Sequence, residues 1–122
     1  MNNRNQTAKY KDMYSICKEV SEYTRTNIND ICGVSQRKPF TYPRHLVCYI
    51  ANVYYKIPKT SIYPIETISS FLSKRNHSTI INSVRTIRVW RQVYPSVDND
   101  VETILRRLAW NVQDAIPQKL AV

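Results

Sequence analysis

Hydrophobic side chains recur every three or four residues along most of the chain, which is the spacing of one face of an α-helix. No segment shows convincingly the alternation of apolar and polar residues that predicts a half-buried strand. The chain is 122 residues long, which suits one domain with a modest core. We therefore expect an all-α fold, a compact helical domain of about five to six helices. The apolar stripes lie within residues 13–23, 46–54, 65–72, 80–87 and 101–112.

Helix breakers divide these stripes. Gly33 is the only glycine and marks a break, before which residues 26–31 can add one short helical turn. The basic segment SQRKPFT, residues 35–41, is expected to form a loop. Pro43 suits the first position of the next helix, and Pro58 ends that helix.

Residues 64–87 have the layout of a helix-turn-helix. Pro64 opens a short helix, a polar break covers residues 73–76, and Asn76 can cap a second helix. The buried stripe of this second helix is predicted to continue toward Trp90 and to consist of Ile80, Ile81, Val84 and Ile87. If that stripe faces the core, four hydrogen-bonding side chains point largely away from it, namely His77, Ser78, Asn82 and Arg85.

The last helix is expected to begin at Asp98 or Asp100, because Tyr94 and Pro95 close the helix before it. Arg106 and Arg107 are expected on its outer face. Its apolar face is predicted to hold Val101, Ile104, Leu105, Leu108 and Val112.

The two ends of the chain are expected to lie outside the domain. Residues 1–11 are polar enough to form a flexible N-terminus. The domain then covers residues 12–113, and a C-terminal tail covers residues 114–122. No apolar run reaches the length of a membrane helix, and the polar start lacks a signal peptide's hydrophobic stretch. We therefore expect a cytoplasmic protein with no membrane partner.

The positive charge is concentrated in the middle of the chain. The formal net charge is +9, from 18 Lys and Arg against 9 Asp and Glu. Residues 35–92 contain ten basic side chains and one acid, Glu66, whereas the flanks hold eight of each sign. Such a basic stretch favours a polyanion, because each neutralised phosphate releases condensed counterions. We therefore expect a nucleic acid as the partner.

Residues that catalysis or metal binding would need are scarce. His45 and His77 are the only histidines, and neither belongs to an HExxH motif or a Cys/His cluster. One glycine cannot build the glycine-rich loop that cradles a nucleotide phosphate. We expect no enzyme activity, cofactor, metal or nucleotide. The three cysteines have no metal-ligand spacing and are expected to be free and buried: Cys17, Cys32 and Cys48.

Two short motifs stand at helix starts. One follows the predicted basic loop, and the other follows the turn of the predicted helix-turn-helix. Pro43-Arg44-His45 is the first, and KRNHSTII, residues 74–81, is the second. Both resemble the C-terminal DNA-binding domain of DnaA, the bacterial replication initiator, which has Pro-Arg-Gln and Gly-Arg-Asp-His-Thr-Thr-Val at these places. The similarity covers residues 12–108. It implies a helix-turn-helix domain of the Trp-repressor-like kind that binds double-stranded DNA.

The resemblance assigns base reading in the major groove to the start of the second helix. Asn76, His77 and Ser78 match the base-reading segment of the family, and Thr79 lies nearby for a base or phosphate. Asn82, on the same outward face, is a further candidate for a base contact. The residues alone leave an alternative, in which Asn76 is only an N-cap and His77 an ordinary surface residue.

Several basic residues are candidates for contacts to the DNA backbone or the minor groove. Arg75 matches the arginine of the family motif, and Lys74 adds charge beside it. In the family a loop arginine reaches the minor groove. Arg37 or Lys38 is the candidate here, although ungapped counting places Gln36 at that position.

Two further arginines are candidates for contacts to the DNA backbone. Arg44 matches the arginine of the family's Pro-Arg pair and suits a phosphate contact from a helix start. Packing of Arg44 against the second helix is the alternative. Arg85 lies on the outward face of the second helix and is also a candidate for a phosphate.

The chain departs from the family in ways that affect function. Asn76 replaces an aspartate, so an acceptor suited to cytosine N4 becomes an amide that can pair with adenine through two hydrogen bonds. Ser73 and Lys74 replace a Gly-Gly turn. We expect no counterpart of the ATPase domain that precedes this domain in DnaA, because a single glycine cannot build its phosphate-binding loop. The chain therefore resembles a freestanding relative, of the kind that a phage or mobile element would use.

The predicted function is sequence-specific binding of double-stranded DNA, with a regulatory role in replication or transcription at the nucleoid. One alternative is a protein-interaction module that engages replication proteins or a second copy of the chain. Another is a binder of RNA or single-stranded DNA, whose bases would stack on tyrosines of the basic region. These tyrosines include Tyr42, Tyr49, Tyr54, Tyr55 and Tyr63.

Overall fold

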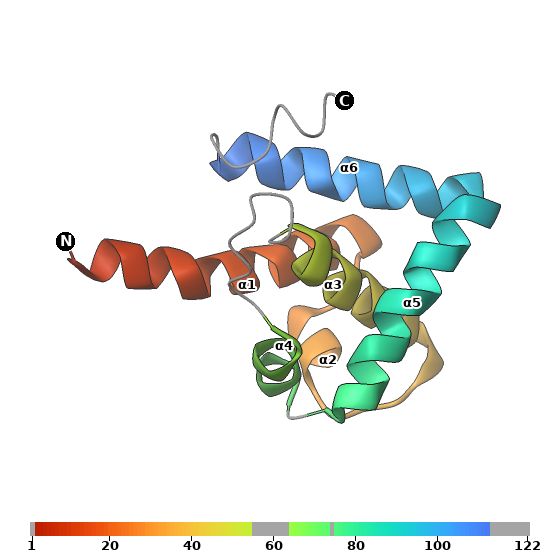
Figure 1. Cartoon of the computed structure of the whole chain (residues 1–122), viewed down its shortest axis with the longest axis horizontal. Helices are drawn as coiled ribbons and strands as arrows, with labels where there is room; N and C mark the ends of the chain where they lie inside the picture. Colours follow the sequence, from red (N-terminus) through yellow and green to blue (C-terminus); the bar gives the residue numbers. More distant parts are fainter. Residues whose placement is uncertain (1, 55–63, 74, 113–122) are drawn as a thin grey trace.

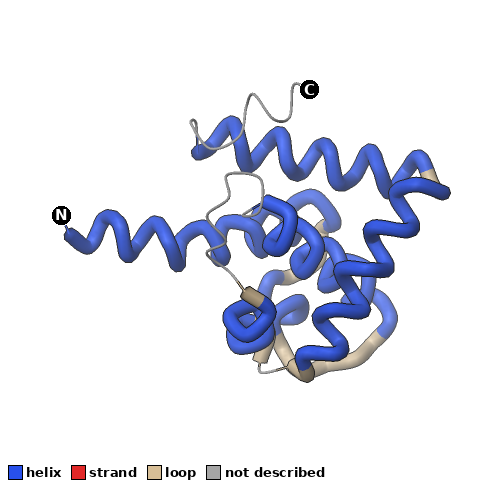
Figure 2. Tube along the Cα trace, in the orientation of Figure 1, coloured by secondary structure: helices blue, strands red, loops and turns tan. Residues whose placement is uncertain are grey.

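Six α-helices and one short 3-10 helix form the chain over the residues that the computed structural model describes, 2–54, 64–73 and 75–112 (Figure 1). These residues contain no strand, as Figure 2 shows. The predicted all-α fold is therefore confirmed. The elements are, in chain order, α1 (Asn2–Thr24), α2 (Ile28–Cys32), η1 (Lys38–Phe40), α3 (Thr41–Tyr54), α4 (Ile65–Phe71), α5 (His77–Val93) and α6 (Pro95–Val112).

Helix α1 is longer than its apolar stripe, because it already begins at Asn2. The flexibility that the sequence predicted for residues 1–11 stays a prediction. Residues 2–11 contain neither proline nor glycine, so nothing in them breaks the helix. The domain limits, residues 12–113 followed by a tail, remain a prediction, and residues 113–122 lie outside the described part of the chain.

The short elements between α1 and α3 differ in detail from the sequence prediction. Helix α2 starts after Asn27, whose Oδ1 accepts a hydrogen bond from Asn29 N at 2.7 Å, and it ends at the predicted break, Gly33. The expected basic loop includes η1, which leads directly into α3 at Thr41. Helix α3 therefore begins before Pro43. Its predicted end at Pro58 lies outside the described residues.

Helix α3 lies at the centre of the molecule and packs against α1, α2, α4, α5 and α6. Its residues 46–51 are all buried. The predicted inward stripe of α3 is confirmed over these residues, and Cys48 and Tyr49 are buried as well because helices surround α3 on more than one side. The other helices contribute to the core Met13, Ile16, Cys17, Val20, Ile31, Ile68, Leu72, Ile80, Val84, Ile87, Val97, Val101, Ile104, Leu105 and Leu108.

Helix α6 begins earlier than predicted, at Pro95 rather than at Asp98 or Asp100. Tyr94 ends α5, as predicted, but its carbonyl oxygen also accepts from Val97 N at 3.0 Å and from Asp98 N at 3.2 Å, which starts α6. Proline has no N–H and a fixed φ, so it fits the first turn of a helix as well as it breaks one. The two helices therefore meet at a sharp corner with no loop between them (Figure 1).

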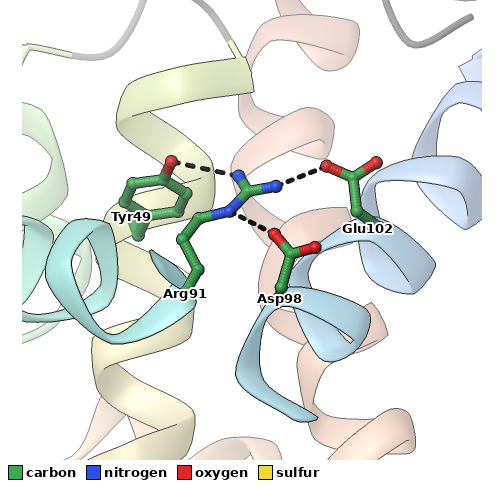
Figure 3. Close-up of polar contacts among 4 residues, drawn as sticks. All are labelled: Tyr49, Arg91, Asp98 and Glu102. Carbon is green, nitrogen blue, oxygen red and sulfur yellow. Dashed lines mark hydrogen bonds and ion pairs between the residues drawn. The ribbon is translucent and has the colours of Figure 1, made fainter. Parts of the chain in front are cut away.

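A charged cluster fixes this corner, and Figure 3 shows its geometry. The guanidinium of Arg91 donates from Nε to Asp98 Oδ1 at 2.8 Å and from Nη2 to Glu102 Oε2 at 2.5 Å. A third bond runs from Nη1 to the hydroxyl of Tyr49 on α3 at 3.2 Å. Burial acts to lower the pKa of Arg91, but these hydrogen bonds raise it overall. The cluster joins α3, α5 and α6.

A second group of polar contacts joins α1 and α3 to α6. The hydroxyls of Tyr23 on α1 and Tyr42 on α3 each donate to the carboxylate of Asp100 at 2.6 Å. The hydrogen bond to Asp100 raises the pKa of Tyr23. The pKa of Tyr42 is raised mainly by burial and in addition by its hydrogen bond to the same carboxylate. Two of the nine tyrosines therefore serve to position α6 rather than to offer free rings.

Candidate nucleic-acid interface

Helices α4 and α5 form the predicted helix-turn-helix, and backbone hydrogen bonds set the turn between them. Leu72 N donates to Ile68 O at 3.0 Å and to Ser69 O at 3.2 Å, which ends α4. Ser73 then adopts a left-handed φ of 63°. Ser69 bonds to both backbone groups of Arg75. The carbonyl oxygen of Ser69 accepts from Arg75 N at 3.2 Å, and its hydroxyl donates to Arg75 O. Lys74 lies outside the described residues.

The first turn of α5 presents polar side chains outward. Asn76 is the N-cap, as predicted, and its Oδ1 accepts from Ser78 N at 2.7 Å. The exposed side chains of this helix include His77, Ser78, Thr79, Asn82 and Arg85. The structure therefore places the predicted base-reading residues on one accessible surface.

The predicted buried stripe of α5 is wrong at one residue. Ile81 is 44% exposed, and Ser83, which the sequence did not place in the core, is only 3% exposed. The buried face consists of Ile80, Ser83, Val84 and Ile87, which follow the i, i+3, i+4, i+7 spacing of one helix face. Ser83 faces α3, where its Oγ lies 2.8 Å from Nδ1 of His45.

The basic loop is tied directly to the turn of the helix-turn-helix. The Nη2 atom of Arg75 donates to Gly33 O at 2.6 Å and to Ser35 O at 3.3 Å. Ser73 adds a bond from its hydroxyl to Cys32 O at 2.5 Å. Arg75, a candidate for a DNA contact, therefore uses its guanidinium to anchor the loop that follows α2.

Arg37 and Lys38 lie at the exposed end of this loop. The guanidinium carbon of Arg37 lies 5.9 Å from the ring centroid of Phe40, so the side chain rests on an aromatic face. Lys38 begins η1. Both residues remain candidates for the minor groove. Gln36 instead lies near Asn76 and Thr79, beside the start of α5.

Arg44, a candidate for a phosphate contact, is buried with 7% of its surface exposed. Its Nε donates to Ile31 O at 2.8 Å and its Nη2 to Asp30 O at 2.7 Å. These carbonyls lie at the C-terminal end of α2, where a cation satisfies acceptors that the helix leaves free. Burial lowers the pKa of Arg44, and the neighbouring charge of Arg75 adds to the effect. The hydrogen-bond partners of Arg44 lie on α2 and not on α5, so these contacts do not match the packing alternative.

An aromatic group that the sequence did not indicate lies between α3 and the C-terminal end of α5. The indole of Trp90 contacts His45 edge-on, with ring centroids 6.0 Å apart, and lies 6.4 Å from both Tyr42 and Tyr94. Burial and the charge of Arg44 lower the pKa of His45. The contacts of Trp90 with Tyr42 and His45 join residues more than 40 positions apart, so no local pattern could have found them.

A polar hollow of about 410 Å³ lies where the loop, α3 and α5 meet. Its lining includes Arg44, Arg75, Asn76 and Thr79, so two positive side chains border the start of α5. Arg85 does not line the hollow and lies further along the exposed face of α5. The described site residues therefore divide into a group around the hollow, a group along the exposed face of α5, and Arg37 and Lys38 on the loop.

The family model of the bacterial dnaA protein helix-turn-helix matches residues 13–87. The chain belongs to this family. Chromosomal replication initiator protein DnaA of Acholeplasma laidlawii strain PG-8A is 25% identical over 89 residues, 73% of this chain and 18% of that protein. A second DnaA of Acholeplasma laidlawii is 25% identical over 88 residues, 72% of this chain and 18% of the relative. No solved structure matches the chain.

Membership of this family confirms the resemblance that the two motifs indicated, and it implies that the chain binds DNA. The match spans less than a fifth of the length of each initiator. Among the described residues, no group of three His, Cys, Asp or Glu side chains is placed to hold a metal ion. No helix in this part of the chain is long and apolar enough to cross a membrane.

Proposed function

We propose that the chain binds a specific sequence in double-stranded DNA through the first turns of α5. The observation that carries the proposal is the exposed polar face of α5, whose opposite face is buried against α3. In a helix-turn-helix the second helix enters the major groove with its N-terminal residues against the base edges. His77, Ser78 and Thr79 occupy these positions.

The basic residues divide into two roles in this proposal. Arg85 and Lys74 contact phosphates, and Arg37 or Lys38 reaches the minor groove from the loop. Arg44 and Arg75 hold α2 and the loop in place and supply positive potential from within the hollow. Phosphate contacts fix the position of the protein on the duplex, whereas base contacts select the sequence.

Replacement of His77 tests the assignment of base reading. A site is first selected from a random duplex pool, and binding of that site and of an unrelated duplex is then measured for His77→Ala. Because a base contact is lost, we expect affinity for the selected site to fall about ten- to hundredfold while binding of the unrelated duplex hardly changes.

The matched control is Gln92→Ala, at the far end of the same helix, where the side chain is also exposed. It should leave both affinities at the wild-type value. An equal loss on both duplexes for His77→Ala would assign this histidine to the DNA backbone, and no loss would remove it from the interface.

The cellular role that we propose is regulation of replication or transcription at a bound site, in the cytoplasm at the nucleoid. Support comes from the family and from two relatives that are named chromosomal replication initiators. Binding would need neither a nucleotide nor a catalytic group. ATP should therefore leave DNA affinity unchanged beyond the effect of any competing polyanion.

Binding of single-stranded nucleic acid is a second candidate, favoured by the partly exposed rings of Trp90 and Tyr94. Bases can stack on such rings without regard to sequence. Tyr49 is buried and the hydroxyl of Tyr42 is bonded to Asp100, which leaves fewer free rings than the composition suggested. Competition between duplex and single strand for the same protein separates the two functions.

A further inference from the structure

The cap of α5 determines which hydrogen-bonding groups Asn76 presents. A backbone N–H donates only to an acceptor, so the atom 2.7 Å from Ser78 N is the amide oxygen Oδ1. The amide nitrogen Nδ2 keeps two donor hydrogens, for which the described residues supply no hydrogen-bond partner. Asn76 is exposed. The side chain therefore offers donors to any group that approaches the start of α5.

The surroundings of Asn76 favour an electronegative partner. The N-terminus of a helix carries a partial positive charge, and Asn76 stands at that end of α5. Arg44 and Arg75 line the same hollow as Asn76. An acceptor opposite Nδ2 is therefore stabilised by three sources of positive potential, whereas a second donor would be repelled.

We propose that Asn76 selects a base whose major-groove edge carries acceptors, with guanine preferred and cytosine disfavoured. This inference rests on the proposed function. Guanine presents two acceptors, O6 and N7, whereas cytosine presents only the N4 amino donor. Pairing with adenine through two hydrogen bonds, as the sequence suggested, would need Oδ1 to accept from the adenine amino group. The cap already uses one lone pair of Oδ1 for Ser78 N, so adenine would have to share this oxygen with the cap, whereas guanine needs only the two free donors of Nδ2.

The test compares the sequences that the wild type and Asn76→Asp select from one random duplex pool. Aspartate is as good an N-cap as asparagine, so the variant keeps the helix while an acceptor oxygen replaces the donor nitrogen. We expect guanine at one position of the wild-type site to be replaced by a base with an amino donor, cytosine or adenine. The preference between guanine and cytosine at that position should change by about ten- to hundredfold.

Asn27 provides a matched control, because it caps α2 in the same way. Its Oδ1 accepts from Asn29 N at 2.7 Å, and its backbone angles of −59° and 134° are close to the −59° and 140° of Asn76. Asn27→Asp therefore makes the same change of charge at another helix and also keeps the N-cap there. It should leave the selected sequence unchanged. The thermal unfolding midpoints of both variants should equal that of the wild-type protein.

The outcomes separate this inference from the proposed function. If the wild type selects no duplex sequence, the proposed function fails and the inference fails with it. If the wild type selects a site that Asn76→Asp leaves unchanged at every position, Asn76 is only a cap, and sequence-specific binding stands without it. If the wild type itself selects adenine rather than guanine at the position that Asn76→Asp alters, or if Asn27→Asp changes the selected sequence equally, the inference is also overturned.

Discussion

At the scale of single residues, Arg44 and Arg75 show that a side chain's partners decide its role. Both carry the charge and the sequence position expected of DNA contacts, yet both donate to backbone carbonyls of α2 or of the loop after it. A buried guanidinium satisfies several acceptors at once, which few other side chains can do. These two arginines therefore shape the surface on which the exposed candidates lie.

The three cysteines should differ in reactivity, although all are free. Cys32 is partly exposed, and its hydrogen bond with Cys17, with Sγ atoms 3.8 Å apart, lowers its pKa against the effect of burial, with help from Arg44. Burial raises the pKa of Cys48 to about 12. The hydrogen bond with Cys32, followed by burial, raises the pKa of Cys17 well above its usual value. Because the thiolate is the reactive form, iodoacetamide at pH 7.5 should modify Cys32 first and the two buried thiols, Cys17 and Cys48, much more slowly, as followed by mass spectrometry of peptides.

A Cys32→Ser variant is the control for this ranking, since it should lose the fast phase of alkylation and keep the slow one. Rapid modification of Cys48 in the folded protein would contradict the burial of that thiol.

At the scale of elements, α5 has different tasks at its two ends. Its first turn presents polar side chains outward from a capped start, and its last turn is held to α6 by Arg91. Between them the buried face of Ile80, Val84 and Ile87 packs on the core. The orientation of the exposed N-terminal face therefore depends on contacts made at the other end of the helix.

Removal of the Arg91 cluster should destabilise the corner between α5 and α6. Arg91→Met keeps most of the side-chain volume but leaves Asp98, Glu102 and Tyr49 without their shared partner. Because Asp98 is half-exposed to water, we expect a loss of about 1–2 kcal/mol in the free energy of unfolding, measured with urea.

The control for this prediction is Arg88→Met, an exposed arginine on the same helix. It removes the same charge and should change stability by less than about 0.5 kcal/mol. Equal effects of the two substitutions would mean that net charge, and not the cluster, determines the loss.

At the scale of the whole molecule, the basic and neutral parts of the chain occupy different elements. The loop, α3, α4 and all of α5 except its last residue fall within residues 35–92, which contain ten basic residues against one acid. Helices α1 and α6, which pack against each other, lie almost entirely in the neutral flanks (Figure 1). The charge that the sequence shows as one segment therefore accompanies the helix-turn-helix in the fold.

This distribution predicts that DNA affinity depends steeply on salt. We expect about four to eight phosphate contacts, so the logarithm of the association constant should fall linearly with the logarithm of salt concentration, with a slope near −4 to −7. Fluorescence anisotropy with a labelled duplex measures this slope.

Arg85→Ala should reduce the magnitude of the slope by about one, because it removes one phosphate contact. Arg106→Ala, an exposed arginine on α6, removes the same charge away from the proposed interface and should leave the slope nearly unchanged. A flat salt response of the wild type would contradict an electrostatic interface.

The sequence by itself determined the helices, their order and the helix-turn-helix. Hydrophobic periodicity and caps are local properties, and the bond from Ser78 N to Asn76 Oδ1 joins residues two positions apart. The exposed positions of His77, Ser78 and Asn82 followed from the same helical geometry. The motif around His77 also indicated the family correctly.

Only the tertiary structure decided which residues support that surface. The burial of Ser83 in place of Ile81 depends on where α3 crosses α5, and the bonds from Ser73 to Cys32 and from Arg75 to Gly33 join residues 41 and 42 positions apart. No periodicity encodes such pairs, because they form when separate helices pack together. The sequence therefore specified the polar first turn of α5, whereas the packing of α2 and α3 specified the rest of its exposed face and what holds it.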